Sequence, residues 1–155
     1  MKLLVALDGT EKDSAALSAA AKLAQETRSE VLLLNVVNPW VDLSSDPAPT
    51  PQERLRHVSA QRQAYLEECL RQFAGLPAAV RVEPKRHPPG QHAEDVAEVI
   101  SRVAAQWESD IAVVASKHPS GIVGLLLGRA VERLLRLSPC PVLVVRPHVP
   151  PRRPV

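Results

Sequence analysis

Short runs of aliphatic residues alternate along this chain with longer segments of helical periodicity, and this alternation limits the fold more than any other feature. The apolar runs predict strands over residues 3–7, 31–37, 79–82, 111–115 and 141–145. Apolar residues at helical spacing predict helices over residues 10–27, 52–73, 93–107 and 126–137. Continuous rather than alternating apolar strands are typical of a parallel sheet that is buried on both faces.

We therefore expect an α/β fold, with a flavodoxin-like or Rossmann-like, doubly wound, mainly parallel five-stranded sheet and helices on both faces. Right-handed crossovers leave few other topologies. The 155 residues suffice for one domain, which we assign to residues 1–147. Residues 148–155, rich in proline and arginine, form a predicted C-terminal tail.

Charge and cysteine content narrow the surroundings of the protein. The net charge of +2 gives no support for a nucleic-acid partner. Cys69 and Cys140 stand in no CxxC or Cys/His pattern, so we expect two small apolar thiols in a reducing compartment. No segment approaches the ~20 apolar residues of a membrane span. A soluble, cytoplasmic protein without nucleic-acid or membrane partners is predicted.

Some single residues have predicted structural roles. Thr10, with Asp13 three residues later, predicts a capping-box-like helix start. Trp40 and Trp107 are expected to be packing anchors. Cys140, between two prolines, is expected to be a buried structural thiol.

Two polar segments follow predicted strands, over residues 8–10 and 116–121. In open α/β sheets, ligands bind outside the carboxyl ends of the strands, where the strand order reverses. The second segment leads through Gly124 and Gly128 into a helix whose free N–H groups could hold an anion. These segments are the candidate site.

Three stretches resemble the universal stress protein family: VALDGT at 5–10, LLLG at 125–128 and SPCPVLVVRP at 138–147. The resemblance extends over essentially the whole chain. It implies a Rossmann-like sheet of the adenine nucleotide alpha hydrolase type. It also implies a homodimer paired through the last strand, at Val142, Leu143, Val144 and Val145.

Members of that family that bind ATP carry Gly-x-x-Gly, nine residues, then Gly-Ser/Thr, and an aspartate after the first strand. The matching aspartate is Asp8, and Val36 falls where the second strand lines the adenine. The four loop positions are occupied here by Ala115, His118, Gly128 and Arg129. Only one of the four is retained. Since glycines in such loops let phosphate oxygens approach the main chain, the substitutions predict loss of ATP binding in the usual pose.

The resulting hypothesis is a non-enzymatic stress-response or regulatory domain without a cofactor. The alternative is a cleft that binds ATP, AMP or another anionic ligand, and a slow nucleotide hydrolase is a third reading. No catalytic or metal-binding residues are assigned, because no GxSxG, complete GxxxxGK[ST] or metal-ligand spacing is present. Asp8 is expected either to contact a ligand or to cap its turn. Arg129, in the first turn of the following helix, is expected to pair with Asp8; the alternative is that it pairs with a bound phosphate or sulfate. The candidate cleft comprises Asp8, Val36, Ala115, Ser116, Lys117, His118, Gly128 and Arg129.

Overall fold

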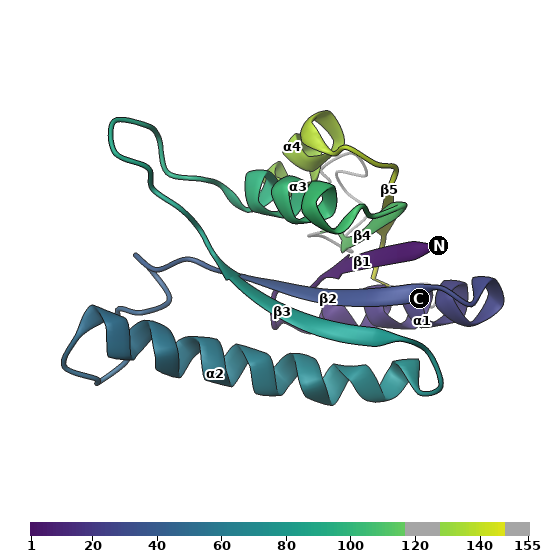
Figure 1. Cartoon of the computed structure of the whole chain (residues 1–155), viewed down its shortest axis with the longest axis horizontal. Helices are drawn as coiled ribbons and strands as arrows, with labels where there is room; N and C mark the ends of the chain where they lie inside the picture. The colour runs from purple at the N-terminus through teal and green to yellow at the C-terminus, as the bar shows by residue number, and fades with distance from the viewer. Residues whose placement is uncertain (117–127, 148–155) are drawn as a thin grey trace, which may run out of the picture.

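The computed structural model describes residues 1–116 and 128–147 of the chain. Within these residues a five-stranded sheet has the order β3-β2-β1-β4-β5, and every neighbouring pair is parallel (Figure 1). The strands are β1 (Lys2–Ala6), β2 (Glu30–Val37), β3 (Ala78–Pro84), β4 (Ile111–Ala115) and β5 (Val142–Val145). The helices are α1 (Asp13–Thr27), α2 (Pro51–Cys69), the 3-10 turn η1 (Leu70–Phe73), α3 (Val96–Trp107) and α4 (Arg129–Leu137). The predicted fold class is confirmed.

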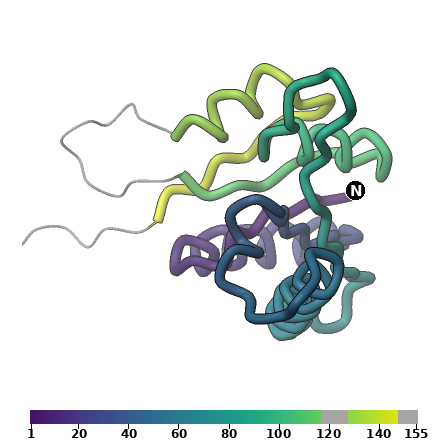
Figure 2. Tube along the Cα trace, turned by 90° about the vertical axis from the view of Figure 1, so that its left-hand side faces the viewer, coloured from purple at the N-terminus to yellow at the C-terminus, as the bar shows by residue number. Residues whose placement is uncertain are grey.

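The helices cover the sheet on both faces, in two separate layers. α1 and α2 lie on one face, and α3 and α4 lie on the other (Figures 1 and 2). The chain builds β1, β2 and β3 outward in one direction, then returns to place β4 on the other side of β1. The strand order therefore reverses between β1 and β4, where a ligand crevice is expected at the carboxyl ends.

Strand β1 shows why continuous apolar runs predict this arrangement. Leu3 and Val5 belong to the core under α1 and α2, while Leu4 between them belongs to the core under α3 and α4. All three side chains are fully buried. Since successive side chains of a strand point to opposite faces, a strand covered on both sides must be apolar at every position.

The start of α1 differs from the prediction. The helix begins at Asp13, and Lys12 at the N-cap position makes no side-chain capping bond. The Thr10 hydroxyl instead donates to the Asp8 carboxylate at 2.6 Å. The Asp13 carboxylate accepts the backbone N–H groups of Asp8 and Gly9 in the same turn. The capping box predicted for Thr10 and Asp13 is therefore wrong, because the carboxylates of Asp8 and Asp13 stabilise the turn that precedes the helix.

The structure places the start of α2 within one residue of the prediction and the start of α3 three residues later than predicted. α2 begins with a capping box between Thr50 and Glu53, with Pro51 in its first turn. α3 begins with a second capping box, between Asp95 and Glu98, so the helix starts at Val96 rather than near residue 93. The predicted helix over 126–137 is described from Arg129, and its first residues lie outside the described part of the chain.

Two predictions about single residues are wrong. Trp40 is 51% exposed and makes a T-shaped contact with His87, with 5.7 Å between the ring centroids, so it does not anchor the core. Cys140 is half-buried rather than buried, although it packs against the core under α3 and α4. Trp107 does pack against that core, and Cys69 is buried.

Candidate functional site

A cavity of about 1010 Å³ opens at the carboxyl ends of the strands, at the point where the strand order reverses. Its apolar wall comes from the ends of three adjacent strands, β2, β1 and β4. The apolar lining residues on those strands are Ala6, Leu34, Val36, Val114 and Ala115. Polar side chains stand around this wall on the loops and helix starts. A concave apolar surface with a few convergent polar groups is typical of a small-molecule site.

Asp8 lies in the turn after β1 and faces this cavity. One carboxylate oxygen accepts hydrogen bonds from the Thr10 N–H at 2.9 Å and the Thr10 hydroxyl at 2.6 Å. The other oxygen lies 2.8 Å from the Lys12 ammonium. Burial raises the pKa of Asp8, but the bonds from Lys12 and Thr10 outweigh burial and lower the pKa from 3.8 to about 2. Lys12, and not the predicted Arg129, is therefore the ion-pair partner of Asp8.

The side chain of Asp13 also stabilises the turn after β1. Its side chain is almost fully buried, with 3% of the residue exposed. The carboxylate accepts the backbone N–H of Asp8 at 3.0 Å and that of Gly9 at 2.8 Å. The Tyr65 hydroxyl donates a third bond from α2. Burial raises the pKa of Asp13 despite these bonds, and the charge on Asp8 raises it further.

The start of α4 forms another wall of the cavity. Gly128 precedes the helix with φ 90° and ψ 146°, a backbone conformation that residues with a Cβ atom rarely adopt. Among residues 1–116 and 128–147 no side chain caps the helix start, so within this part of the chain the first N–H groups of the helix have no side-chain acceptor. Arg129 is exposed on the first turn and lines the cavity. Among the described residues it makes no ion pair.

The ends of β2 and β3 form the opposite wall, where Arg62 reaches in from α2. Its guanidinium makes two long contacts, 3.4 Å to the Asn35 side-chain oxygen and 3.7 Å to the Asp42 carboxylate. Lys85 follows β3 and also lines the cavity. Within the described parts of the chain its ammonium has no ion-pair partner. This wall therefore offers several N–H donors to the cavity.

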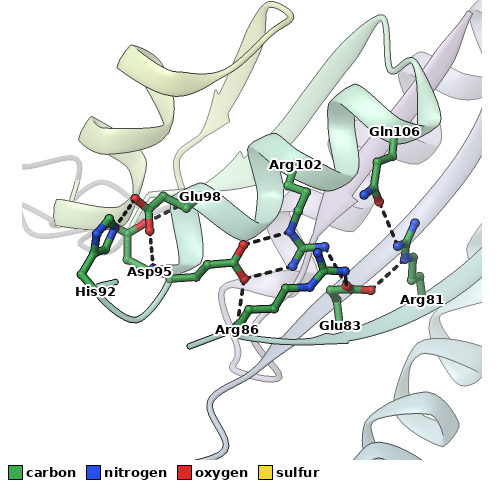
Figure 3. A network of polar contacts seen from close by, with 9 residues as sticks. Arg81, Glu83, Arg86, His92, Asp95, Glu98, Arg102 and Gln106 are labelled. Carbon is green, nitrogen blue, oxygen red and sulfur yellow. Dashed lines mark hydrogen bonds and ion pairs between the residues drawn. The ribbon is translucent and has the colours of Figure 1, made fainter. Parts of the chain in front are cut away.

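A polar network holds α3, β3 and their connection together beside the cavity (Figure 3). Arg102 on α3 contacts Glu83 at 2.7 Å and the Glu94 carboxylate at 2.9 and 3.0 Å. Glu83 is 9% exposed, and Arg81 lies 3.0 Å from it. Burial raises the pKa of Glu83, but Arg102 and Arg81 outweigh burial and lower it. The network therefore fixes the connection that carries His92 and Asp95 to the cavity.

The starts of α3 and α4 are also joined to each other. Arg133 on α4 pairs with Asp95 and lies 3.4 Å from Glu98, the two residues of the α3 capping box. His92 approaches the same Glu98 oxygen at 2.9 Å, and this bond is the main reason that the pKa of Glu98 is lowered. The position of the α4 N-terminus therefore depends on the capped end of α3.

The structure brings five of the eight predicted site residues to the cavity: Asp8, Val36, Ala115, Gly128 and Arg129. Ser116 is 2% exposed, does not line the cavity, and its hydroxyl finds no hydrogen-bond partner among the described residues. Lys117 and His118 lie outside the described residues.

Several polar residues of the cavity wall were not predicted from the sequence. Arg62 and Lys85 resemble the other basic residues of solvated helix faces and loops, so the sequence carries no signal that separates them. The Asp95 and Glu98 capping box was readable as Asp-Val-Ala-Glu before an apolar stripe. Lys12 was readable as a basic residue four positions after Asp8.

Neither a metal-binding cluster nor a membrane-spanning helix is present in residues 1–116 and 128–147. No group of three or more His, Cys, Asp or Glu side chains is arranged to hold a metal ion there. Within those same ranges, no helix has the length and apolar character needed to cross a membrane.

Comparison with known proteins matches the model of the universal stress protein family to residues 1–146. The universal stress protein YxiE of Bacillus subtilis (strain 168) is 29% identical over 153 residues, which cover 94% of this chain and 98% of that protein. A universal stress protein structure from Burkholderia pseudomallei is 27% identical with a TM-score of 0.67, covering 93% of this chain and 94% of that one. A universal stress protein structure in complex with cAMP shares the fold at a TM-score of 0.63 and 16% identity, covering 94% and 96%.

Proposed function

This chain belongs to the universal stress protein family, and we propose that it is a non-enzymatic stress-response domain that binds a purine nucleoside monophosphate. The ligand would occupy the cavity at the carboxyl ends of β2, β1 and β4. Its phosphate would lie at the N-terminus of α4, and its base would lie on the apolar wall near Val36.

The observation that carries this proposal is the start of α4. Gly128 keeps a glycine-like backbone there, and within the described part of the chain no side chain caps the helix and Arg129, on its first turn, makes no ion pair. Free N–H groups, the positive end of the helix dipole and a guanidinium together favour a phosphate. A cation in the first turn opposes the dipole, so a bound anion would relieve an unfavourable interaction.

The remaining contacts suit the nucleoside. Asp8 uses three of the roughly four lone-pair sites of its carboxylate on Thr10 and Lys12, so it can accept one more bond, from a ribose hydroxyl. The apolar ends of β2 and β4 provide a surface for a planar base. The universal stress protein solved with cAMP holds a nucleotide that also has one phosphate.

Magnesium ATP is a poorer fit by the same argument. In ATP-binding members, the glycine loop after the fourth strand lets phosphate oxygens approach the main chain. Here Ala115 carries a Cβ at the first of those positions, and His118 occupies the second. Only Gly128 remains, at the helix start, where a single phosphate is sufficient to fill the free donors.

The proposal assigns binding rather than catalysis to the cavity because its carboxylates already have structural tasks. Asp8 is held at a pKa of about 2 by Lys12 and Thr10, which outweigh its burial, so it is a weak base at neutral pH. Asp95 and Glu98 cap α3 and pair with Arg133. We further propose that the protein acts in the cytoplasm as a homodimer paired through β5.

Thermal unfolding with and without ligand tests this function. A ligand that binds only the folded state stabilises it by RT ln(1 + L/Kd), where L is the free ligand concentration, so at equal concentration the tighter ligand raises the melting temperature more. AMP and GMP should each raise it, adenosine and guanosine should raise it less, and magnesium ATP should raise it less than either monophosphate. Arg129→Ala should weaken monophosphate binding about tenfold, because it removes one charge-assisted contact to the phosphate.

Arg136→Ala is the matched control, since Arg136 is exposed on the last turn of the same helix and does not line the cavity. It should leave the nucleotide response unchanged. If neither monophosphate stabilises the protein, or if both arginine variants reduce the response equally, the proposal is wrong.

A further inference from the structure

Arg62 supplies most of the hydrogen-bond donors on the β2 and β3 wall of the cavity. The side chain is half-buried and the guanidinium has five N–H donors. Its contact with the Asn35 oxygen is 3.4 Å, at the limit of hydrogen bonding, and its 3.7 Å approach to Asp42 is an ion pair without a hydrogen bond. Most of these donors therefore remain available to a ligand.

Lys85 adds a second cation to this wall. Its backbone N–H donates to the Val37 carbonyl at 2.9 Å, which fixes the residue at the ends of β2 and β3. The ammonium has no ion-pair partner among the described residues, and the side chain is half-buried at the cavity. A ligand group at this wall would therefore meet two cations.

The hydrogen-bond acceptors of the same wall are largely engaged within the protein. The Asn38 side-chain oxygen accepts the Trp40 N–H at 3.2 Å. The Asn35 amide donates to the Leu7 carbonyl, and its oxygen faces Arg62. One Asp42 oxygen accepts the Asn38 N–H at 2.7 Å. The wall thus offers the donors of Arg62, Lys85 and the Asn38 NH2 group, and one carboxylate, while the oxygens of both side-chain amides already accept a bond.

Guanine and adenine would form different hydrogen bonds with this wall. Guanine presents two adjacent acceptors, O6 and N7, which arginine and lysine recognise. Adenine presents an N6 donor beside N7, which is recognised by an asparagine or glutamine amide with both groups free. The Asn35 amide is engaged through both groups and the Asn38 oxygen accepts the Trp40 N–H, so neither amide has both groups free. An adenine N6 donor would therefore face two cations, Arg62 and Lys85, with the Asp42 carboxylate as the remaining acceptor.

The strand order places this wall where the base of the proposed ligand would lie. β2 is separated from β4 by β1, so the two ends of the cavity are two strand spacings apart, ~10 Å. A phosphate at α4 and a ribose beside Asp8 direct the base toward β2 and therefore toward Arg62 and Lys85.

We propose that Arg62 and Lys85 make this cavity selective for a guanine nucleotide over an adenine nucleotide. Arg62 and Lys85 donate to O6 and N7, and the free lone pairs of Asp42 accept from the donor groups of the guanine edge. The inference rests on the proposed function, because it assumes that the phosphate lies at α4.

Calorimetric titration of the full chain with GMP, IMP and AMP tests the selectivity. GMP is expected to bind about tenfold more tightly than AMP. IMP keeps O6 and N7 but lacks the 2-amino group, so it should bind nearer to GMP than to AMP. AMP binding that equals or exceeds GMP binding overturns the selectivity and leaves the proposed function intact. Failure of all three nucleotides to bind removes both.

The variants Arg62→Gln and Lys85→Gln assign the effect to the wall. Each should reduce the ratio of GMP to AMP affinity by about threefold to tenfold. Arg71→Gln and Lys22→Gln, at exposed positions away from the cavity, are the matched controls and should keep the ratio. Circular dichroism confirms that each variant is folded. A folded Arg62→Gln variant with an unchanged ratio contradicts the proposal.

Discussion

The hydroxyl of Tyr65 on α2 donates a hydrogen bond of 2.5 Å to the buried carboxylate of Asp13 at the start of α1. Asp13 in turn accepts the backbone N–H groups of Asp8 and Gly9. One carboxylate therefore joins α2, α1 and the turn after β1. The geometry of the cavity at Asp8 depends on this connection.

Removing the hydroxyl with Tyr65→Phe should lower the free energy of unfolding by about 2 kcal/mol, since a hydrogen bond to a charged group is lost. The loss should narrow as the pH falls through the raised pKa of Asp13, because a protonated carboxyl gains less from this donor. Urea unfolding at several pH values measures both effects. Gln61→Ala, at an exposed position of α2, is the control and should cost far less. A pH-independent loss would contradict the assigned role.

Asp8 gives a second prediction that depends on pH. Its pKa is lowered from 3.8 to about 2, because bonds from Lys12 and Thr10 outweigh its burial. A lowered folded-state pKa contributes stability above the unfolded value and loses it as the pH falls through the folded value. Asp8→Asn should therefore cost roughly 1 kcal/mol at neutral pH, a figure reduced for solvent screening, and little at pH 2. An equal cost at both pH values would show that Asp8 is not held in this way.

Arg102 should be the most sensitive residue of the network in Figure 3. Arg102→Gln leaves the nearly buried Glu83 with Arg81 at 3.0 Å as its closest cation. The expected loss is about 2 kcal/mol, below that for a fully buried pair because Arg81 remains. Since the pKa values of Glu83 and Glu94 are both lowered from 4.5, the loss should diminish below that pH. Arg71→Gln breaks an exposed pair with Glu68 and should cost under about 0.5 kcal/mol.

The proposed homodimer pairs through the edge strand β5. Leu143 is 39% exposed on this edge, and Leu135 and Leu137 on the neighbouring α4 are 49% and 42% exposed. An uncovered apolar edge favours pairing with a second chain, here by a two-fold operation. Leu143→Lys should convert the proposed dimer to a monomer, measured by light scattering. Leu143 is the better position than Val144, which packs in the core under α3 and α4. A monomeric unmodified protein would remove the proposed interface.

The order of strands and helices could be predicted because each apolar run has one simple cause, burial between two helix layers. The predicted bounds of the strands lie within about two residues of the observed ones. Thr10 could not be assigned correctly, because a Thr followed by Asp after three residues fits both a helix cap and a folded turn. The choice depends on Tyr65, which is distant in sequence and donates to Asp13.

The candidate site was predictable at the strand ends and at Gly128, where local patterns indicate turns and helix starts. It was not predictable at Arg62 or Lys85, because their role depends on which loops meet across the sheet. The pairing of Asp8 with Lys12 rather than with Arg129 has a local cause. Lys12 is one helical turn away in sequence, and the turn between them brings its ammonium to 2.8 Å.

The central claim is that the cavity holds one nucleoside monophosphate with its phosphate at the start of α4. Isothermal titration of the purified chain with GMP, AMP and magnesium ATP tests it directly. The account predicts one site per chain, a dissociation constant in the micromolar range or below for GMP, weaker binding of AMP, and the weakest binding for magnesium ATP. Magnesium ATP binding more tightly than both monophosphates, or no heat with any nucleotide, would contradict it.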